Sequence, residues 1–347
     1  MTQTLAQAPT RRPSRAPRAL AIGAGAVLVL LGAILLSVSV GLVPLGAAET
    51  MRAIVSPSSV DAQTAAIVWS VRLPRTVVAV IVGAALAGVG VALQAVFRNP
   101  LADPGVTGVS SGAAVGAVAG MTMGLAGSLQ WGVPIAAFVG SLVVALILQA
   151  VMQAVRGASP HTLILVGVAI NAFAGATISM LIANADDDAL ARGAMFWLAG
   201  DLELRNWSHA GIVILPVVLG LGLLLLRTRA LDALLLGDDV AATSGFDVHR
   251  TRLVLLLVTS LVTGAAVSVS GVIGFVGLVV PHAVRLVLGG RHSQLLPVSI
   301  ICGALFLVGA DTIARTAFGN AVVQTGAVSA FIGAPVFLFL LLSRRKA

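Results

Sequence analysis

Long apolar segments follow one another along most of the 347-residue chain, separated by short polar stretches. A helix that crosses a bilayer needs about 20 mostly apolar residues, and ten segments reach or approach this length. The eighth is the least regular, because it is short and contains Pro281, His282 and Arg285. Since the short alternating segments of a transmembrane barrel are absent, the pattern predicts an all-α polytopic membrane protein with about ten transmembrane helices. The predicted spans lie near residues 20–42, 76–97, 106–125, 132–152, 163–183, 208–226, 253–270, 272–288, 295–313 and 327–342.

Polar residues bound this apolar region at both ends. Residues 1–18 are rich in proline and arginine, show no apolar periodicity, and are predicted to form a disordered basic tail on the cytoplasmic side. A cleaved signal peptide is disfavoured, because the apolar run that follows covers about 23 residues without a clear cleavage site. Residues 19–343 form the predicted transmembrane domain, with a polar loop at 230–250, and residues 344–347 form a short basic C-terminus.

Basic residues divide unevenly between the two sides of the predicted membrane region. Ten spans put both termini on one side, and that side then carries fifteen of the 21 Lys and Arg residues. The positive-inside rule therefore predicts cytoplasmic termini. Because the basic residues are scattered between apolar segments, they indicate membrane topology and not a nucleic-acid partner. Two residues on the outer side, Arg72 and Arg75, flank Pro74, which is predicted to fix the start of the second span. The full outer set is Arg52, Arg72, Arg75, Arg192, Arg205 and Arg315.

Two sparse residue types exclude classes of chemistry. Lys346 is the only lysine, and a P-loop needs a lysine after its glycine-rich turn to hold nucleotide phosphates, so the chain contains no such ATPase. An ATPase that drives this protein would be a separate polypeptide. The five histidines show no paired metal-ligand spacing, so no metal site is predicted. The single cysteine, Cys302, is interpreted as a small buried hydrophobe.

One motif in the third span has an enzymatic counterpart. The stretch GVSSGA begins at Gly108 and matches the nucleophile elbow of hydrolases, with Ser110 or Ser111 as the nucleophile. That elbow needs a preceding strand and a nearby histidine and acid, whereas this one opens an apolar helix after a turn-rich loop. An intramembrane hydrolase is therefore a remote alternative. Glycines at positions 112, 116, 120 and 124 instead predict a smooth helix face that a neighbouring backbone approaches closely.

Few polar residues lie within the predicted spans. Asp311 is the only acid there, and it is predicted to form a local ion pair with Arg315, four residues later. Because intramembrane acids are costly and accompany ion coupling, their scarcity disfavours an ion-coupled secondary transporter. Uncharged polar residues are candidates for a translocation path, although Ser and Thr also bond their own helix backbone. The candidates are Gln94, Asn171, Ser179 and Thr263.

The loop between the sixth and seventh spans mixes acids with apolar residues. Its pattern predicts short amphipathic helices broken at Gly237 and Gly245. A helix of this kind on the membrane face suits docking to a partner protein, and a solvated loop is the alternative. The acids in the loop are Asp232, Asp238, Asp239 and Asp247.

Several motifs, by their order and spacing, resemble the FecCD-type permease family, the membrane subunits of ABC importers for iron-siderophores, haem and vitamin B12. The resemblance covers nearly the whole chain after the basic tail. The motifs are RLPR (72–75), QAVFRNPLADPG (94–105), GVSSGA (108–113), LVGVAI (165–170), LGDDVA (236–241), GVIGFVGLVVPH (271–282), ADTIAR (310–315) and GAPVF (333–337).

The resemblance implies the type II ABC importer permease fold in a bacterial cytoplasmic membrane. It implies a dimer with a second permease subunit, identical or sister, and an extracytoplasmic binding protein that delivers the substrate. ATP and Mg²⁺ are expected on two partner ATP-binding subunits, with no cofactor bound to this chain. The expected cargo is an iron-siderophore, with haem and vitamin B12 as alternatives.

The resemblance also assigns roles to individual residues. Docking of the binding protein is expected at Arg72, Arg75 and Arg315, and the alternative is that these arginines only anchor helix ends. ATPase coupling is expected at Leu236, Gly237, Asp238, Asp239, Ala241 and Gly245. The cytoplasmic gate is expected at Asn99, Pro100, Leu101, Ser159 and His161.

Overall fold

The computed structural model describes residues 16–41, 43–128, 131–155, 160–185, 187–317 and 323–343. Within these ranges the chain is helical and contains no strand. Eight described helices are long and apolar enough to span a bilayer, and two shorter apolar helices, Val109–Thr122 and Val276–Leu288, complete the set. The predicted all-α polytopic fold is confirmed; the eighth span is short, as predicted, and the third span is short as well.

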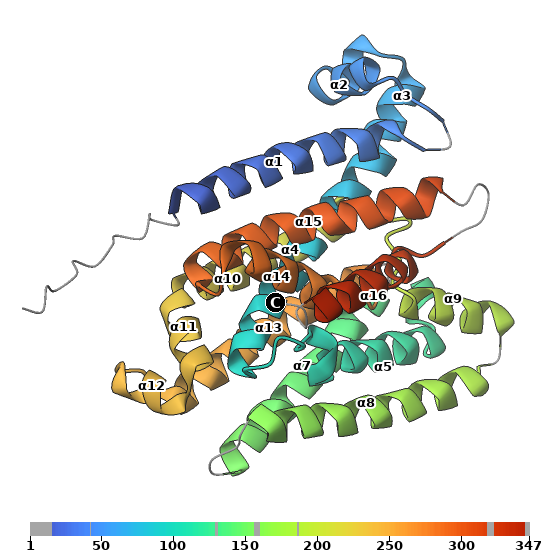
Figure 1. Ribbon diagram of the computed structural model, residues 1–347. Coiled ribbons are helices and arrows are strands. Elements are labelled where there is room, and N and C mark those ends of the chain that lie inside the picture. The colour runs from blue at the N-terminus through green and yellow to red at the C-terminus, as the bar shows by residue number, and fades with distance from the viewer. Residues whose placement is uncertain are drawn as a thin grey trace, which may run out of the picture.

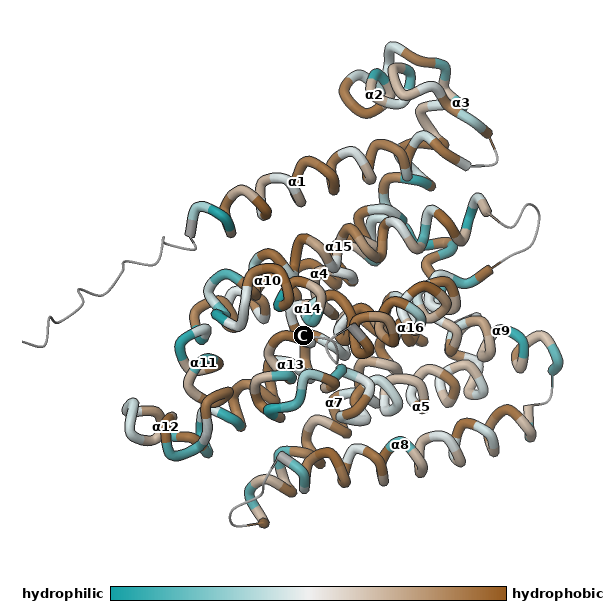
Figure 2. The backbone as a smooth tube through the Cα atoms, in the orientation of Figure 1, coloured by the Kyte–Doolittle hydropathy of each residue, from teal (hydrophilic) through white to brown (hydrophobic). Residues whose placement is uncertain are grey.

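The ten apolar helices run between two ends of the molecule (Figure 1). We call the end that holds α11 (Thr228–Leu236) and α12 (Asp238–Thr243) the α12 end, and the opposite end, which holds α9 (Asp188–Leu198), the α9 end. Hydrophilic residues gather at these ends and apolar residues line the helices between them (Figure 2). The apolar helices are α1 (Ala16–Ser39), α4 (Leu73–Val96), α5 (Val109–Thr122), α7 (Gly132–Ala154), α8 (Pro160–Ala183), α10 (Trp207–Leu226), α13 (Val248–Ser270), α14 (Val276–Leu288), α15 (His292–Thr316) and α16 (Thr325–Ser343).

Short helices connect the long ones, and two of them take up the ends of the predicted span 106–125, so that α5 is shorter than predicted. They are α2 (Ala47–Val55), α3 (Ala62–Ala66) and α6 (Leu125–Ser128), with 3₁₀ turns at Pro57–Ser59 and Pro104–Thr107. Helix α1 begins at Ala16, so Pro17 and Arg18, which the sequence assigned to the basic tail, are helical. The rest of that predicted tail, and residues 344–347, lie outside the described residues.

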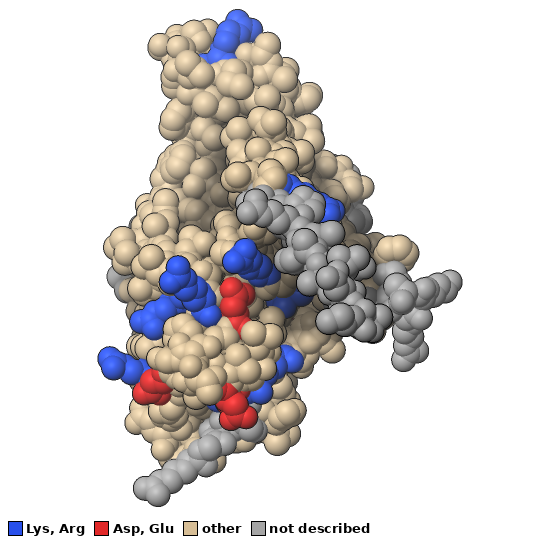
Figure 3. All heavy atoms as spheres, turned by 60° about the vertical axis from the view of Figure 1, so that its left-hand side comes forward, with Lys and Arg blue, Asp and Glu red and all other residues tan. Residues whose placement is uncertain are grey.

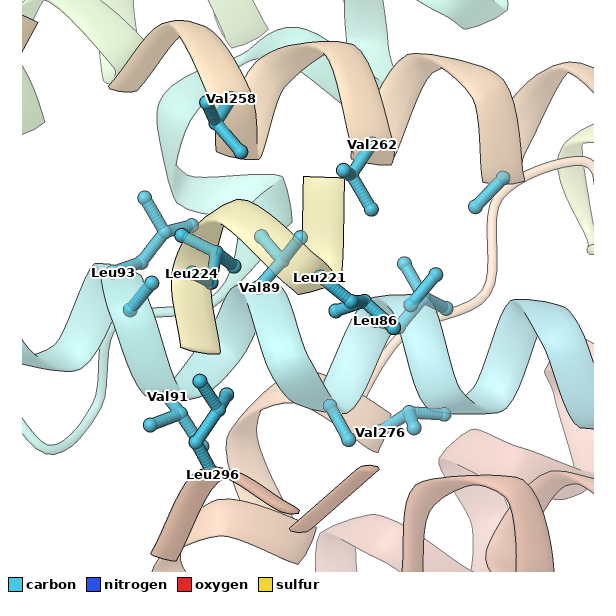
Figure 4. Close-up of a cluster of buried hydrophobic side chains, with 14 of the residues drawn as sticks. Leu86, Val89, Val91, Leu93, Leu221, Leu224, Val258, Val262, Val276 and Leu296 are labelled. Atoms are coloured by element: carbon cyan, nitrogen blue, oxygen red, sulfur yellow. The ribbon is translucent and has the colours of Figure 1, made fainter. Parts of the chain in front are cut away.

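Helix α4 lies at the centre of the bundle. The span that contains it is 83% buried, whereas α1 is only 6% and α8 only 17% buried in their most apolar windows. Helices α10, α13, α14 and α15 pack around α4, and Figure 4 shows Leu86, Val89 and Leu93 of α4 among their apolar side chains. A helix that is apolar on every side is suited to this central position.

The second span is longer than the sequence predicted. Helical structure is continuous from Ala62 to Val96, and residues Ile67–Arg72 within it form a π-helix. The Leu73 N–H donates to Val68 O, five residues back, and the α-helical register begins there. The prediction that Pro74 fixes the helix start holds for α4, where Pro74 lies in the first turn, but the continuous helical segment begins earlier, at Ala62. Since proline has no N–H to donate, it is accommodated where the hydrogen-bond register already changes from π to α.

The glycine stripe on α5 packs against α7 as predicted. A Cβ atom on Gly116 would lie 2.1 Å from Ala136 O, and one on Gly112 would lie 2.6 Å from Gly140 O. Gly120 also faces Ala136, but Gly124 lies beyond the end of α5, with φ +75°, and a Cβ atom on it would meet nothing within 4 Å. Three of the four glycines therefore set the distance between the two helix backbones.

We predict that Gly116→Ala destabilises the protein by about 1–3 kcal/mol, because the added methyl group overpacks a fixed backbone contact. Gly222→Ala on α10, where a Cβ atom meets nothing within 4 Å, is the matched control and is expected to be neutral or to stabilise by up to about 1 kcal/mol. Unfolding of the two purified variants in detergent measures both effects. Equal effects at the two positions would contradict the packing role of Gly116.

Candidate functional site

A buried carboxylate organises the α9 end. Asp311 of α15 is fully buried, and its Oδ1 accepts hydrogen bonds from Arg75 Nη2 at 2.8 Å and from Thr325 Oγ1 at 2.9 Å. Its Oδ2 accepts from Arg315 Nε at 3.1 Å. The predicted local pair of Asp311 and Arg315 is confirmed, and Arg75, 236 positions away, is an additional partner. Asp311 therefore joins α4, α15 and the start of α16.

Arg315, together with Arg72, also holds the C-terminal end of α1. Arg72 donates to Val38 O at 2.8 Å and Ser39 O at 2.9 Å, and Arg315 donates to Ser37 O at 3.0 Å. The last carbonyls of a helix have no partner within the helix, and cationic side chains stabilise that end of the helix dipole. Anchoring of helix ends, one of the two roles considered for these arginines, is thus part of the structure.

Part of the cluster formed by Arg72, Arg75, Arg315 and Asp311 reaches the surface. The side chains of Arg75 and Arg315 are each 14% exposed, whereas Arg72 is buried. The three guanidinium groups outnumber the single carboxylate of Asp311, so the cluster carries a positive charge. Burial is the main cause that lowers the pKa of Arg205, which the sequence placed on the same side; the charge of Asp201 opposes this lowering and that of Arg75 adds to it.

The α12 end contains the two short amphipathic helices predicted from the loop sequence. Helix α11 stops at Gly237, with φ +133°, and α12 is followed by Gly245, with φ +86°. Both predicted breaks are confirmed. Ala241 is buried, whereas Leu236 and Asp239 are exposed, so α12 offers an outward face.

An ion-pair network connects α12 to the rest of the bundle. Asp238 Oδ1 accepts from Arg252 Nη2 of α13 at 2.8 Å, and also from Arg98 Nη2. The Arg252 side chain is 5% exposed and that of Asp238 is 44% exposed. Arg98 directly precedes the predicted gate residues Asn99, Pro100 and Leu101. The sequence reasoning found Asp238 but neither of its arginine partners.

Arg98 adopts an unusual backbone conformation at the end of α4. Its φ is +49°, while Asn99 N donates to Gln94 O and Arg98 N donates to Ala95 O. These two bonds define a Schellman motif, in which the residue at the position of Arg98 is usually glycine. A side chain with a positive φ costs free energy, so this position keeps its arginine in spite of a local penalty.

The predicted gate segments both contain residues at the surface. Asn99 Oδ1 accepts from Leu101 N at 2.9 Å, and Leu101 is 43% exposed. His161 is exposed in the first turn of α8. Ser159 lies outside the described residues. Asp103 lies in the same segment between α4 and α5 as Asn99. Burial raises the pKa of Asp103 to about 6, and its Oδ1 accepts a hydrogen bond from Gly105 N at 2.9 Å.

The four pathway candidates do not lie in one place. Gln94 is buried, accepts from Arg285 Nη2 at 3.3 Å and donates to Gly277 O, so it joins α4 to α14. Thr263 is buried and donates to Thr259 O of its own helix. Asn171 accepts from Ser111 Oγ at 2.7 Å and links α8 to α5. Ser179 is exposed on α8.

The hydrolase motif does not have the setting that its chemistry needs. A 3₁₀ turn, Pro104–Thr107, precedes it in place of a strand. Ser110 is buried, and Ser111 bonds to Asn171 and not to a histidine. Among the described residues, no group of three His, Cys, Asp or Glu side chains could hold a metal ion.

Comparisons with known proteins agree over almost the whole chain. Residues 27–343 match the FecCD transport family. The cobalamin import permease BtuC of Halobacterium salinarum is 42% identical, over 80% of this chain and 74% of its own length. The hemin transport permease HmuU of Yersinia pestis is 40% identical, over 80% of this chain and 84% of its own length. The ferric enterobactin permease FepD of Escherichia coli is 37% identical, over 95% of this chain and 96% of its own length.

A solved structure has the same arrangement of helices. It is a metal-chelate type ABC transporter in an inward-facing conformation, with a TM-score of 0.83 and 28% sequence identity. The superposition covers 93% of this chain and 99% of the other. The ten apolar helices, the two polar ends and the sequence match lead to one conclusion: the chain belongs to the FecCD transport family.

Proposed function

We propose that this chain is the membrane-spanning permease subunit of an ATP-driven importer whose cargo is a metal chelate. The observation that carries the proposal is the pair of helices α11 and α12, which present an outward face and are connected by Asp238 to the chain segment that follows α4. A polar docking surface of this kind suits a separate ATPase, since the chain has no P-loop lysine of its own.

A ferric siderophore is the proposed cargo, and haem and cobalamin are equally supported by the relatives. All three are large ligands that contain a metal. An ion-coupled carrier is less well supported, because Asp311, the acid buried within a span, is already neutralised by Arg75 and Arg315. No proton or sodium ion is needed to compensate its charge.

The exposed faces of α8 and α16 are the proposed contact with a second permease subunit, identical or sister. Phe173 of α8 is 75% exposed and Phe331 of α16 is 82% exposed, although both helices contain residues that pack on the bundle. Ser179 lies on α8, which is largely exposed. A pathway between two subunits would therefore be lined in part by α8.

Coupling is proposed to run from α12 through Asp238 to Arg98. When the ATPase moves α12, the shared carboxylate transmits the displacement to Arg98, which is continuous with the gate residues Asn99–Leu101. Asp239 is exposed beside it and is available to the ATPase. The alternating access that results is a population shift, driven by the different affinities of the partners for the two states.

Docking of an acidic binding protein is proposed at the α9 end. The positive cluster of Arg75, Arg315 and Arg72 surrounds one carboxylate, so it attracts an acidic surface even though its members are engaged within the chain. Charge of this kind raises association rates and orients partners more than it adds affinity.

The first prediction from this proposal concerns the energy source. Proteoliposomes that hold this chain with its ATPase and its binding protein are expected to accumulate a ferric siderophore, haem or cobalamin only when ATP is supplied. Uptake is measured for each cargo in parallel. Uptake that persists without ATP and collapses with the proton gradient would contradict the importer proposal.

The second prediction concerns coupling through Arg98. Arg98→Gly keeps the C-terminal motif of α4 and removes its strain, while it removes one arginine from Asp238. We expect the free energy of unfolding to change by less than about 1 kcal/mol, since the pair is partly exposed, and uptake per ATP hydrolysed to fall strongly. Uptake and ATPase activity are measured on the same reconstituted complex.

Arg98→Lys, which retains the charge, is expected to recover part of the uptake. Arg250→Gln, which alters an exposed arginine on α13 that has no part in the Asp238 network, is the matched control and should keep normal coupling. If Arg98→Gly retains the wild-type ratio of uptake to ATP hydrolysis, the proposed connection does not transmit the motion.

The third prediction separates docking from helix anchoring. Arg75→Gln and Asp311→Asn break the same buried pair, and each should cost about 3–5 kcal/mol of stability. They change the charge of the cluster in opposite directions, however. If the cluster steers an acidic binding protein, the association rate falls for Arg75→Gln and rises for Asp311→Asn, and both differences shrink at high salt.

Surface plasmon resonance with the purified binding protein, on variants shown to be folded at the assay temperature, gives these rates. Association rates that fall equally in both variants would assign the cluster to anchoring alone.

A further inference from the structure

An apolar groove lies along the contact between the first half of α1 and the first half of α15. It has a volume of about 550 Å³ and is lined on α1 by Leu20, Gly23 and Ala24, and on α15 by Gln294, Pro297 and Val298. A Cβ atom on Gly23 would lie 3.7 Å from Val298 Cγ2, so the two helices touch there. The small residues Gly23 and Ala24 leave the space beside that contact empty.

This groove faces the surface of the bundle and not its core. Helix α1 is the least buried of the long helices in the described chain, and Leu20 in the wall of the groove is 74% exposed. Figure 1 shows α1 at one edge of the bundle, beside α15. In a bilayer this position is open to lipid, and its apolar lining suits a hydrocarbon chain better than a hydrated solute.

Basic residues flank the groove at the α12 end. Arg18 directly precedes the lining residue Ala19, and Arg291 lies two residues before the lining residue Ser293. Both arginines are exposed. The nearest acid on the neighbouring helix α11 is Asp232, which His292 engages through its backbone N–H at 2.9 Å and its Nδ1 at 2.6 Å. Figure 3 shows basic side chains gathered over this end of the molecule, with acidic side chains among them.

We propose that the groove binds an anionic phospholipid. One acyl chain lies along Leu20, Ala24 and Pro297, and the phosphate is held between Arg18 and Arg291. Arginine binds phosphate through paired N–H donors, and basic sites between transmembrane helices attract anionic head groups. This inference does not depend on the cargo or on the ATPase.

Charge complementarity favours a lipid over a protein segment as the occupant. The chain before α1, residues 1–15, is polar and basic, so it would be repelled by the two arginines and would leave the apolar walls unfilled. A helix of a second subunit would bury the exposed arginines against lipid-facing residues and would have to neutralise them.

The test uses the reconstituted complex in mixed bilayers of phosphatidylglycerol and phosphatidylcholine. After extraction, native mass spectrometry counts the lipids of each kind that remain bound. Wild-type protein is expected to retain phosphatidylglycerol preferentially. Arg18→Gln and Arg291→Gln should each lower that preference roughly fivefold, whereas Arg250→Gln, on a helix that packs on α4, α7 and α10, should leave it unchanged.

A second variant tests the apolar half of the site. Ala24→Leu fills the groove without a change of charge, and it should reduce the number of retained lipids of both kinds. Retention without head-group preference, a preference that survives loss of both arginines, or an equal loss in Arg250→Gln would overturn the proposal. A change in the number of permease subunits per complex in Ala24→Leu would instead identify a protein occupant, and would also overturn it.

Discussion

Close backbone contact between helices is the constraint on which this structure depends. In a bilayer, apolar side chains gain little by leaving lipid for another helix, so association relies on close packing. Cβ atoms on Gly83 and Gly90 of α4 would lie 2.3 Å from Gly303 O and 2.0 Å from Gly277 O, respectively. Only glycine permits α15 and α14 to approach the central helix at these points. The same device joins α5 to α7, so the core and one flank share a single packing principle.

Two aspartates give the ends of the molecule different mechanical properties. Asp311 is fully buried and saturated by donors from three helices, and removal of a partner from such a pair is costly. The side chains of the Arg98–Asp238 pair are 35% and 44% exposed, and an exposed pair contributes little stability. The α9 end is therefore a fixed junction, whereas the connection at the α12 end can be remade at small cost. A partner protein that moves is therefore best placed against the α12 end.

Local features of this fold could be predicted from the sequence, and contacts between distant segments could not. The ten spans follow from apolar length, the Asp311–Arg315 pair from its four-residue spacing, and the breaks in the α11–α12 loop from Gly237 and Gly245. Helices that are apolar all round give no periodic signal of which face meets which neighbour. The partners Arg75 for Asp311 and Arg98 for Asp238 therefore emerge only when the helices are placed in space.

The π-helical segment before α4 has a consequence for the comparison of sequences. A π turn amounts to one residue inserted into an α-helix, and one residue turns an α-helix by about 100°. Without this extra residue, α3 would be turned by about 100° around the axis of α4, whereas Arg72, which directly adjoins α4, would stay beside the carbonyls of Val38 and Ser39 that it now binds. A gap of one position in an alignment of relatives over residues 62–75 therefore indicates a different direction of α3 relative to α4, even where both arginines are retained.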